Sequence, residues 1–376
     1  MKKIYVLIVA ITFWNSMNST LFASTPLISN KSICAVILAA GQGSRLKTGI
    51  TKLITPICGQ PMALYTVRLM QQLSIPTTVI IGYQKEAVKN AIDSAHIPGL
   101  FFAEQLEQLG TGHALLCSKD TWHADNILVM NGDMPLVSAE IINKLCSEHF
   151  KTNAAISFIT CLNVDPANAF GRIIQTNGHI KIVEKKHFVG DINNHPYVNA
   201  GIYLINRHFL ETFLTNIQQN ETTQEFYITD LVELASNNNL PVTTVTFPFE
   251  RLNGVNTFAE LAIVEQIKRD ELIAHWMAQG VRFIAPHTVH IDLDVKIGRG
   301  TVISSGVQLL NGTTIGEFCT IAPHAVLDHA TLENNITIGA HSFLCDAHVT
   351  KDTTLAAFSS HTLNTSSCIK LTHNRY

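Results

Sequence analysis

Short apolar segments alternate with helix-like patterns from about residue 31 to residue 247 of the chain. Residues 35–39 are continuously apolar, which is typical of a parallel strand buried on both faces of a sheet. Residues 79–81 and 127–130 predict two further interior strands. This alternation predicts an α/β fold with a mainly parallel sheet, which we assign to residues 31–255.

A long helical pattern follows this region. Residues 258–277 predict one helix with a single apolar stripe, and Gly280 would end it. We therefore assign residues 256–280 to a linker helix between two domains. The stripe contains Leu261, Val264, Ile267, Leu272 and Trp276.

Beyond Gly280 the period of the apolar residues changes to six. This period predicts a parallel β-helix, because an ordinary strand would repeat every two residues. The register slips near Glu333, resumes at Ile338 and fades after about Val349, so we expect about three to four coils within residues 281–350. Residues 351–376 are left as a polar tail. The recurring residues are Ile291, Ile297, Ile303, Leu309, Ile315, Ile321 and Leu327.

The amino-terminal segment 1–30 contains an apolar run, residues 4–14, preceded by Lys2 and Lys3. The run is short for a membrane span but suits the apolar region of a signal peptide or an anchor. An amphipathic extension, or a true start at Met17, is the alternative explanation of the segment. Contact with a membrane is expected only through residues 4–14, if they are retained.

Composition excludes several classes of protein. With 46% hydrophobic and 15% charged residues, the 376-residue chain is neither disordered nor collagen-like. Its 26 basic residues do not exceed its 29 acidic ones, so we expect no nucleic-acid partner. The eight cysteines include no CxxC pair, which predicts mostly buried free thiols in a reducing compartment, without a disulfide framework or a zinc site.

The first predicted strand runs into the glycine-containing sequence LAAGQGSRL at residues 38–46. Such a loop lets backbone N–H groups approach a phosphate closely, and Arg45 and Lys52 add two cations. The spacing matches neither a Rossmann fingerprint nor a Walker loop. A glycine-rich turn beside two solvated cations is the alternative, but the position directly after the strand favours phosphate binding.

These residues resemble the opening loop of sugar-1-phosphate nucleotidyltransferases. Gln105, followed by EQLGTGHA at residues 107–114, narrows the resemblance to N-acetylglucosamine-1-phosphate uridyltransferases, which are usually the front half of a bifunctional protein with a hexad-repeat acetyltransferase. The resemblance covers about residues 33–350. It implies a Rossmann-like nucleotidyltransferase domain with a mixed, mainly parallel sheet, followed by a short left-handed parallel β-helix. Further matches are NGDMPL at 131–136, FGRI at 170–173, IVE at 182–184, VNAG at 198–201, YITD at 227–230 and GVN at 254–256.

The resemblance also assigns roles to individual residues. Asp133 follows an apolar strand, where the carboxyl edge of a parallel sheet binds ligands; the family uses this aspartate and the asparagine matching Asn256 to hold Mg²⁺, an ion that prefers oxygen ligands. Arg45 and Lys52 would be catalytic cations, and Tyr227 to Asp230 would build structure around the site. The nucleotide would contact Leu38, Ala39, Ala40, Gly41, Lys52, Gln105, Gly110 and Thr111, and the sugar Gly171, Glu184 and Asn199.

Three residues in the site depart from the family. Thr51 replaces the usual proline before Lys52, Asn131 replaces a tyrosine, and Ala200 replaces a threonine beside Asn199. None of these changes removes a charged or metal-binding group, but together they could loosen the sugar pocket or shift its preference.

The rear half departs more strongly from the family. It is short and ends without a basic cluster or a histidine in the acetyltransferase context, so we expect no acetyl transfer and a structural role, in a homotrimer as in the family. Its scattered histidines are expected at solvated coil corners; they are His287, His290, His324, His329, His341 and His348.

The expected reaction is Mg²⁺-dependent transfer of uridylyl from UTP to N-acetylglucosamine 1-phosphate, which gives UDP-N-acetylglucosamine and pyrophosphate. Another nucleotide or sugar 1-phosphate, a non-catalytic relative that binds a nucleotide sugar, and a hexad-repeat acyltransferase are the alternatives. Because UTP and Mg²⁺ are cytoplasmic supplies, we expect a cytoplasmic enzyme, although the apolar residues 4–14 leave export or membrane attachment open.

Overall fold

The structure is a computed structural model that describes residues 32–43, 46, 49–163, 165, 168 and 170–362. The predictions for residues 1–30, for Arg45 and for most of the polar tail concern residues outside these ranges. Within them, no helix is both long and apolar enough to cross a membrane.

The front domain is built on a nine-stranded sheet in the order β11-β7-β10-β6-β1-β4-β5, with β8 paired to β10 and β9 paired to β8. All the strands on the main path run parallel except β10, which is antiparallel to both β6 and β7. The mixed, mainly parallel sheet is therefore confirmed. The strands are β1 (Ile33–Ala39), β4 (Thr77–Ile81), β5 (Leu100–Glu104), β6 (Asn126–Asn131), β7 (Ile156–Leu162), β8 (Arg172–Thr176), β9 (His179–Val183), β10 (Tyr197–Asn206) and β11 (Val242–Thr246).

Helices cover both faces of this sheet. Alternate residues of β1 enter different cores: Ile37 belongs to one buried cluster and Val36 to the other. Helices α2, α3 and α5 supply the first cluster, and α4, α6 and α7 supply the second. The helices are α2 (Met62–Gln72), α3 (Lys85–Asp93), α4 (Thr111–Cys117), α5 (Ala139–Thr152), α6 (Arg207–Phe213) and α7 (Asp230–Asn237).

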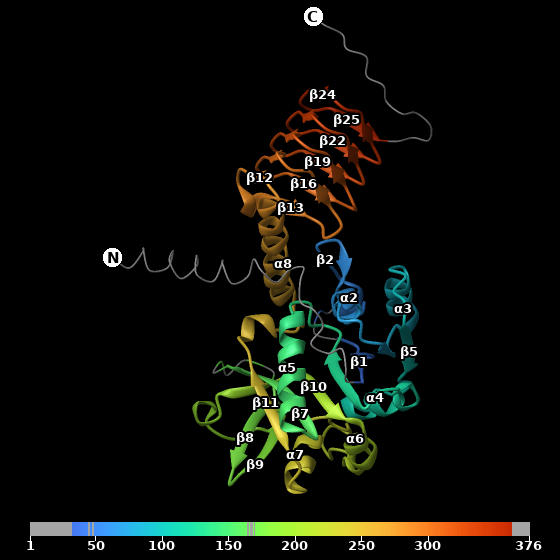
Figure 1. The fold of residues 1–376 in the computed structure, drawn as a ribbon, viewed down its shortest axis with the longest axis vertical. Helices are drawn as coiled ribbons and strands as arrows, with labels where there is room; N and C mark the ends of the chain where they lie inside the picture. The colour runs from blue at the N-terminus through green and yellow to red at the C-terminus, as the bar shows by residue number, and fades with distance from the viewer. Residues whose placement is uncertain are drawn as a thin grey trace, which may run out of the picture.

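Helix α8 (Phe258–Ala278) leads from the front domain to the second domain (Figure 1). A capping box of Thr257 and Glu260 begins the helix, and Gly280, at φ +86°, follows its end. The hairpin of β2 (Pro56–Ile57) and β3 (Gln60–Pro61) contacts both regions, because the Leu293 N–H donates to the Cys58 carbonyl at 2.9 Å. A helix thus lies within the segment 256–280 that the sequence assigned to a linker.

The second domain is a parallel β-helix whose strands stack in three sheets of five, five and four strands (Figure 1). The apolar hexad residues point inward as a continuous buried cluster. The strands are β12 (Arg282–Phe283), β13 (His290–Ile291), β14 (Lys296–Ile297), β15 (Val302–Ile303), β16 (Gln308–Leu310), β17 (Thr314–Ile315), β18 (Thr320–Ile321), β19 (Val326–Asp328), β20 (Thr331–Leu332), β21 (Thr337–Ile338), β22 (Phe343–Cys345), β23 (His348–Val349), β24 (Thr354–Leu355) and β25 (Ser360–Thr362).

The expected end of the coils near residue 350 is wrong, because β24 and β25 pair with the coil before them. Ile297 pairs with Ile315, but Ile315 pairs with Leu332, one residue sooner along the chain. One turn of each later coil is thus a residue shorter, which breaks the six-residue period while Leu332 and Leu355 still point inward. The domain therefore has more than the three to four coils that the hexads predicted.

Candidate active site

The two predicted metal ligands and the predicted catalytic lysine meet at the carboxyl edge of the sheet. Asp133 follows β6, Lys52 begins the short 3₁₀ helix Lys52–Ile54 after β1, and Asn256 precedes α8. The Lys52 ammonium donates to Asp133 Oδ2 and, at 2.7 Å, to Asn256 Oδ1. Only 14% of the Lys52 and Asp133 side chains is exposed, so this ion pair is largely shielded from water.

Backbone contacts hold Asn256 beside Asp133. The Val255 N–H donates to the Asp133 carbonyl at 3.0 Å, and a Cβ on Gly254 would stand 3.4 Å from the Asp133 carboxylate oxygens. The Asn256 N–H donates to Glu260 Oε2 at 2.7 Å, in the capping box that begins α8. The start of the linker helix thus positions a residue of the front domain's site.

The donor set at this point suits Mg²⁺. One carboxylate oxygen of Asp133 and the amide oxygen of Asn256 converge on a single positive charge, that of the Lys52 ammonium. Mg²⁺ binds proteins through one or two such oxygens and keeps water and substrate phosphates as its other ligands. Asp133 and Asn256 would therefore hold the ion. No group of three or more histidine, cysteine or acidic side chains arranged for a metal is found among the described residues.

The turn that carries Lys52 is fixed by a neighbouring loop. Thr51 is fully buried, and its N–H donates to Gln84 Oε1 at 2.8 Å, while Gln84 Nε2 donates to the Gly49 carbonyl at 2.8 Å. The family's proline at this position has no N–H and could not make the first of these bonds. Gly43, at φ +60°, lies against the Lys52 side chain, where a Cβ would come within 3.0 Å of Cγ.

The predicted nucleotide residues Gln105 and Gly110 contact each other. Gln105 follows β5 and is buried, and its Nε2 donates to the Gly110 carbonyl at 3.0 Å and lies 3.1 Å from His113 Nδ1. Gly110, at φ +97°, leaves no room for a side chain, because a Cβ would lie 2.5 Å from the Phe226 carbonyl oxygen. Gln105 borders a surface hollow of about 690 Å³, together with Ile50, Ile54, Gly82, Gln84, Lys85, Glu86, Ala87, Glu104 and Leu106.

The predicted sugar residues form a second group. The Gly171 carbonyl accepts from the Asn199 N–H at 2.9 Å, and a Cβ on Gly171 would stand 3.6 Å from Glu184 Oε2. The Asn199 amide is engaged within the protein, because Nδ2 donates to the Tyr203 hydroxyl at 2.6 Å and Oδ1 accepts from the Gly201 N–H at 3.1 Å. Asn199 pairs with Thr160 of β7, just before the point where the register between β10 and β7 shifts.

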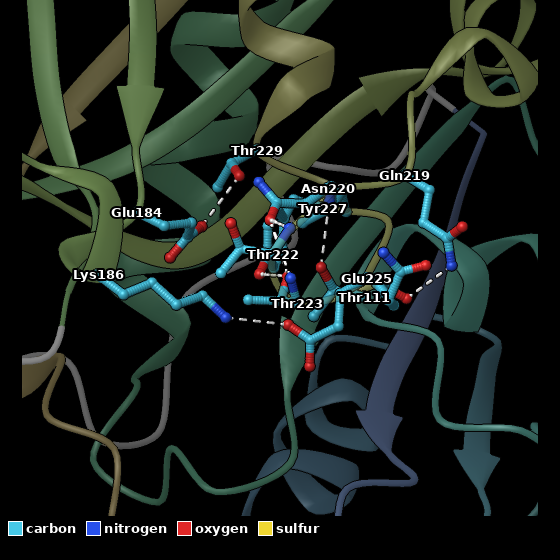
Figure 2. A network of polar contacts seen from close by, with 12 residues as sticks. Thr111, Glu184, Lys186, Gln219, Asn220, Thr222, Thr223, Glu225, Tyr227 and Thr229 are labelled. Atoms are coloured by element: carbon cyan, nitrogen blue, oxygen red, sulfur yellow. Dashed lines mark hydrogen bonds and ion pairs between the residues drawn. The ribbon is translucent and has the colours of Figure 1, made fainter.

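The segment 219–229 joins these two groups. On the nucleotide side, the Ile228 N–H donates to Thr111 Oγ1 at 3.0 Å, and the Phe226 carbonyl accepts from the Gly112 N–H at 2.8 Å. On the sugar side, the Thr229 hydroxyl donates to Glu184 Oε1 at 3.0 Å. Figure 2 shows Thr111 and Glu184 meeting side chains and backbone of this segment. The segment lies just before and at YITD, which the sequence predicts to be structural.

A salt bridge adds a second contact on the sugar side. Lys186 Nζ lies 3.2 Å from Glu225 Oε2 and 5.1 Å from the centre of the Tyr227 ring (Figure 2). The Tyr227 hydroxyl in turn shares a hydrogen bond with Thr223 Oγ1 at 2.5 Å. Segment 219–229 is therefore joined by more than one bond to the residues that follow β9.

Burial shifts the pKa of two carboxyl groups here. Desolvation raises the pKa of Glu184 above its usual range, partly opposed by the hydrogen bond from Thr229 and by nearby Lys186. Desolvation, with the charges of Glu233 and Glu184, raises the pKa of Asp230 from 3.8 to about 6. Both carboxyl groups lie near the junction of segment 219–229 and α7, where Thr229 donates to Glu184 and Asp230 begins the helix.

The structure thus gathers most of the predicted residues into three groups, two of which are joined by segment 219–229. Lys52, Asp133 and Asn256 form one group, Gln105 and Gly110 a second, and Gly171, Glu184 and Asn199 a third. Leu38, Ala39, Ala40 and Gly41 end β1 and begin the loop after it, and Arg45 lies outside the described residues.

Sequence reasoning assigned no role to several residues that hold this site. Gln84 supports the turn of Lys52, His113 contacts Gln105, and Tyr203 contacts Asn199. Gln84 and Tyr203 stand outside every quoted motif. His113 is part of the EQLGTGHA motif at residues 107–114, so the motif could have pointed to it.

Comparisons with known proteins agree with this architecture. Residues 35–186 match the family described as the MobA-like NTP transferase domain, and residues 294–329 match the bacterial transferase hexapeptide (six repeats). A solved structure described as a glucose-1-phosphate thymidylyltransferase from Bacillus anthracis, in complex with a sucrose, superimposes with a TM-score of 0.51 and 22% identity. It covers 64% of this chain and 96% of its own, and it shows the nucleotidyltransferase fold alone.

Curated relatives carry the comparison further. The chain is 35% identical over 330 residues to the bifunctional protein GlmU of Geobacillus sp. (strain WCH70), covering 86% of this chain and 71% of the relative. It is 32% identical over 332 residues to the bifunctional protein GlmU of Desulfotalea psychrophila, covering 86% of this chain and 96% of that relative. With this similarity over both domains, the chain belongs to the family of bifunctional GlmU proteins.

Proposed function

We propose that this protein transfers uridylyl from UTP to N-acetylglucosamine 1-phosphate and releases pyrophosphate. The observation that carries the proposal is the convergence of Lys52, Asp133 and Asn256 at the carboxyl edge of the sheet, in a chain of this family. A lysine, a carboxylate and an amide oxygen suit a site for phosphates and a divalent cation.

The reaction needs no nucleophile from the protein, which instead positions the substrates and neutralises their charge. A phosphate oxygen of the sugar phosphate would attack the α-phosphorus of UTP in line, and pyrophosphate would leave with the electron pair of the broken bond. Mg²⁺, when bound, would neutralise charge on the phosphates. Its binding by Asp133 and Asn256 would displace the Lys52 ammonium, which could then neutralise a phosphate oxygen; Arg45 would add a second cation.

The remaining residues would select the two substrates. Gln105, Gly110 and Thr111 would contact the nucleotide, and the end of β1 from Leu38 to Gly41 would approach its phosphates. Gly171, Glu184 and Asn199 would contact the sugar. Glu184 would accept hydrogen bonds from sugar hydroxyls.

A different sugar 1-phosphate is the second candidate substrate. Two observations favour it: the Asn199 amide is already bonded to Tyr203 and Gly201, and Ala200 stands where the family has a threonine. A sugar without the acetamido group would make fewer demands on Asn199.

Pyrophosphate release with a panel of nucleoside triphosphates and sugar 1-phosphates tests the proposal. We expect turnover with UTP, N-acetylglucosamine 1-phosphate and Mg²⁺, and loss of turnover with a chelator. Release with a different sugar phosphate at higher kcat/KM would establish the second candidate. No release with any pair, from a folded protein with Mg²⁺ present, would make the chain a non-catalytic relative.

The role of the β-helix belongs to the same proposal. We expect no acetyl transfer from acetyl-CoA to glucosamine 1-phosphate, because polar side chains at the described coil corners, such as His329 and Asn335, are engaged with the neighbouring coil. We expect a homotrimer through the coil faces, which light scattering at micromolar concentration would measure. The UTP-dependent reaction would take place in the cytoplasm.

A further inference from the structure

The orientation of the Gln105 side-chain amide is determined by its partners. Gln105 Nε2 lies 3.0 Å from the Gly110 carbonyl oxygen. A carbonyl oxygen can only accept a hydrogen bond, so the NH₂ group and not Oε1 must face it. The Gly110 carbonyl is itself held in place, because it also accepts from the Ala114 N–H at 3.1 Å in α4.

The second hydrogen of the same NH₂ group is used by His113. Gln105 Nε2 lies 3.1 Å from His113 Nδ1, so Nδ1 must be the unprotonated acceptor. The ring then carries its proton on Nε2, which faces Cys117 Sγ at 3.8 Å. His113 lies on α4, and its Nδ1 gives the Gln105 amide a second hydrogen bond besides that to Gly110.

These two bonds leave only the oxygen of Gln105 for a ligand. Among the described residues, no hydrogen bond is made to Oε1, although the residue as a whole is 97% covered and 3% exposed. Gln105 borders the hollow of about 690 Å³ at the ends of β4 and β5. A base that binds in this hollow and pairs with the Gln105 amide would therefore meet Oε1, an acceptor that cannot be exchanged for the NH₂ donor without breaking both bonds of the amide.

We propose that His113 is a specificity-determining residue that makes this site prefer bases with a ring N–H, such as uracil and thymine, over cytosine. The inference rests on the proposed function and refines it, because it explains which pyrimidine is accepted. Uracil and thymine carry a hydrogen on ring N3, which pairs with Oε1. Cytosine carries a lone pair on N3, so two acceptors would face each other and stay unpaired. His113 is a positioning residue, since it acts through Gln105.

The experiment compares UTP, CTP and dTTP in wild type and three His113 variants. His113→Leu and His113→Phe remove the acceptor, and the second keeps a ring of similar shape. His113→Asn retains an acceptor, because its Oδ1 can take the position of Nδ1. Cys117→Ala is the matched control on the same helix. The readouts are kcat/KM for each nucleotide at saturating sugar 1-phosphate, and Kd of each nucleotide by calorimetry without the sugar phosphate.

In wild type we expect UTP and dTTP to exceed CTP. The ratio of UTP to CTP should fall by up to about 10-fold in His113→Leu and His113→Phe, because only the Gly110 bond then holds the amide and turning its NH₂ toward cytosine N3 breaks one hydrogen bond instead of two. It should stay near wild type in His113→Asn and Cys117→Ala. The ratio of UTP to dTTP should not change in any variant, because both bases carry the N3 hydrogen. A loss of folding would instead weaken all three nucleotides together.

Two results would overturn the inference. One is an unchanged ratio of UTP to CTP in both variants that lack the acceptor, with normal thermal unfolding. The other is a fall of the same size in His113→Asn. Failure of the proposed function is a separate result, since it would appear as absent pyrophosphate release in wild type. In that case the calorimetric ratios still decide between the predicted preference and none.

Discussion

Polar side chains in the two domains find their partners in different ways. In the β-helix the partners are one coil apart: Asn335 donates to Asp352 at 3.1 Å, and His329 contacts Asp346 at 2.6 Å, each across 17 residues of chain. In the front domain Lys52 joins Asp133 across 81 residues and Asn256 across 204. In the coils, polar side chains therefore bond to the equivalent position of the next coil. The site of the front domain is instead assembled from segments that are far apart in the sequence.

This difference indicates where the chemistry lies. At the coil corners, Asn335, His329 and Asp346 occupy left-handed backbone positions, and their side chains bond to the equivalent corner of the neighbouring coil. These hydrogen bonds between successive corners give the polar side chains partners and hold the turns, which are structural roles. The Lys52 group instead gathers one cation and two oxygens at a sheet edge, an arrangement suited to substrate phosphates.

The largest expected effect comes from breaking the Lys52 group. Asp133→Ala should lower turnover about 10²–10³-fold, because the phosphates lose a charged ligand of their cation. Asn256→Ala should have a smaller effect, since a neutral amide binds the ion less strongly. The double variant should be less impaired than the product of the two effects, because both residues serve one ion. Steady-state pyrophosphate release at several Mg²⁺ concentrations measures all three.

The matched control lies in the coils. His329→Ala breaks a contact of similar length, but its side chain is 70% exposed and serves no substrate in this proposal, so turnover should stay within about twofold. A multiplicative loss in the double variant, or an unchanged Mg²⁺ dependence of Asp133→Ala, would contradict a shared ion. A large loss in His329→Ala would mean that the coils contribute to catalysis.

The sequence predicts the coils and the sheet well because both rest on local periodicity. The hexads from Ile291 to Leu327 specify inward positions directly, and the apolar run at residues 35–39 specifies a buried strand. The prediction fails where the period breaks. Leu332 and Leu355 are buried like their predecessors, but a turn one residue shorter removes them from the six-residue pattern.

The site is less predictable, because its support comes from single side chains at long range. Motifs name Asp133 and Asn256, but nothing in the sequence shows that Lys52 bridges them or that Gln84 holds the backbone of Thr51. The same holds for Thr229, whose hydroxyl reaches Glu184 only after the chain folds. Periodicity carries no information about such pairs.

A smaller effect is expected where segment 219–229 meets the sugar group. Thr229→Val removes the hydroxyl that donates to the half-buried Glu184, at a cost of about 1–2 kcal/mol, so KM for the sugar phosphate should rise about 5- to 30-fold. KM for UTP should not change, and Thr229→Ser should restore the wild-type value. The Thr229 side chain does not cap α7, so the helix start is unaffected.

An exposed threonine of the coils provides the comparison for this change. Thr337→Val, in β21, should leave both KM values within about twofold, because surface substitutions have small effects. Initial-rate kinetics with each substrate varied in turn distinguish the two positions. Equal increases of KM for UTP and for the sugar phosphate in Thr229→Val would indicate general damage instead of a role at Glu184.

The smallest expected effect is on the pH dependence of folding stability, to which two carboxyl groups contribute with opposite signs. Burial raises the pKa of Asp230 to about 6, whereas the hydrogen bond from His329 lowers the pKa of the exposed Asp346 below its usual range. The folded state therefore holds the Asp230 proton more tightly than the unfolded state does, and stability from this group falls as pH rises from about 4 to about 6. Asp346 behaves oppositely: it stabilises above its ordinary pKa, and that stability is lost as pH falls through the lowered value.

Urea unfolding at several values between pH 4 and pH 7 measures both signs. Asp230→Asn should flatten the decline of stability with rising pH by on the order of 1–2 kcal/mol, less than the full shift implies because the group is partly exposed to solvent. Asp346→Asn should change the curve only at the acid end and in the opposite direction. Because α7 also loses a favourable charge near its first turn in Asp230→Asn, a constant offset is expected, and only the slope is diagnostic. A curve for Asp230→Asn that runs parallel to wild type from pH 4 to pH 7 would show that burial does not hold the Asp230 proton.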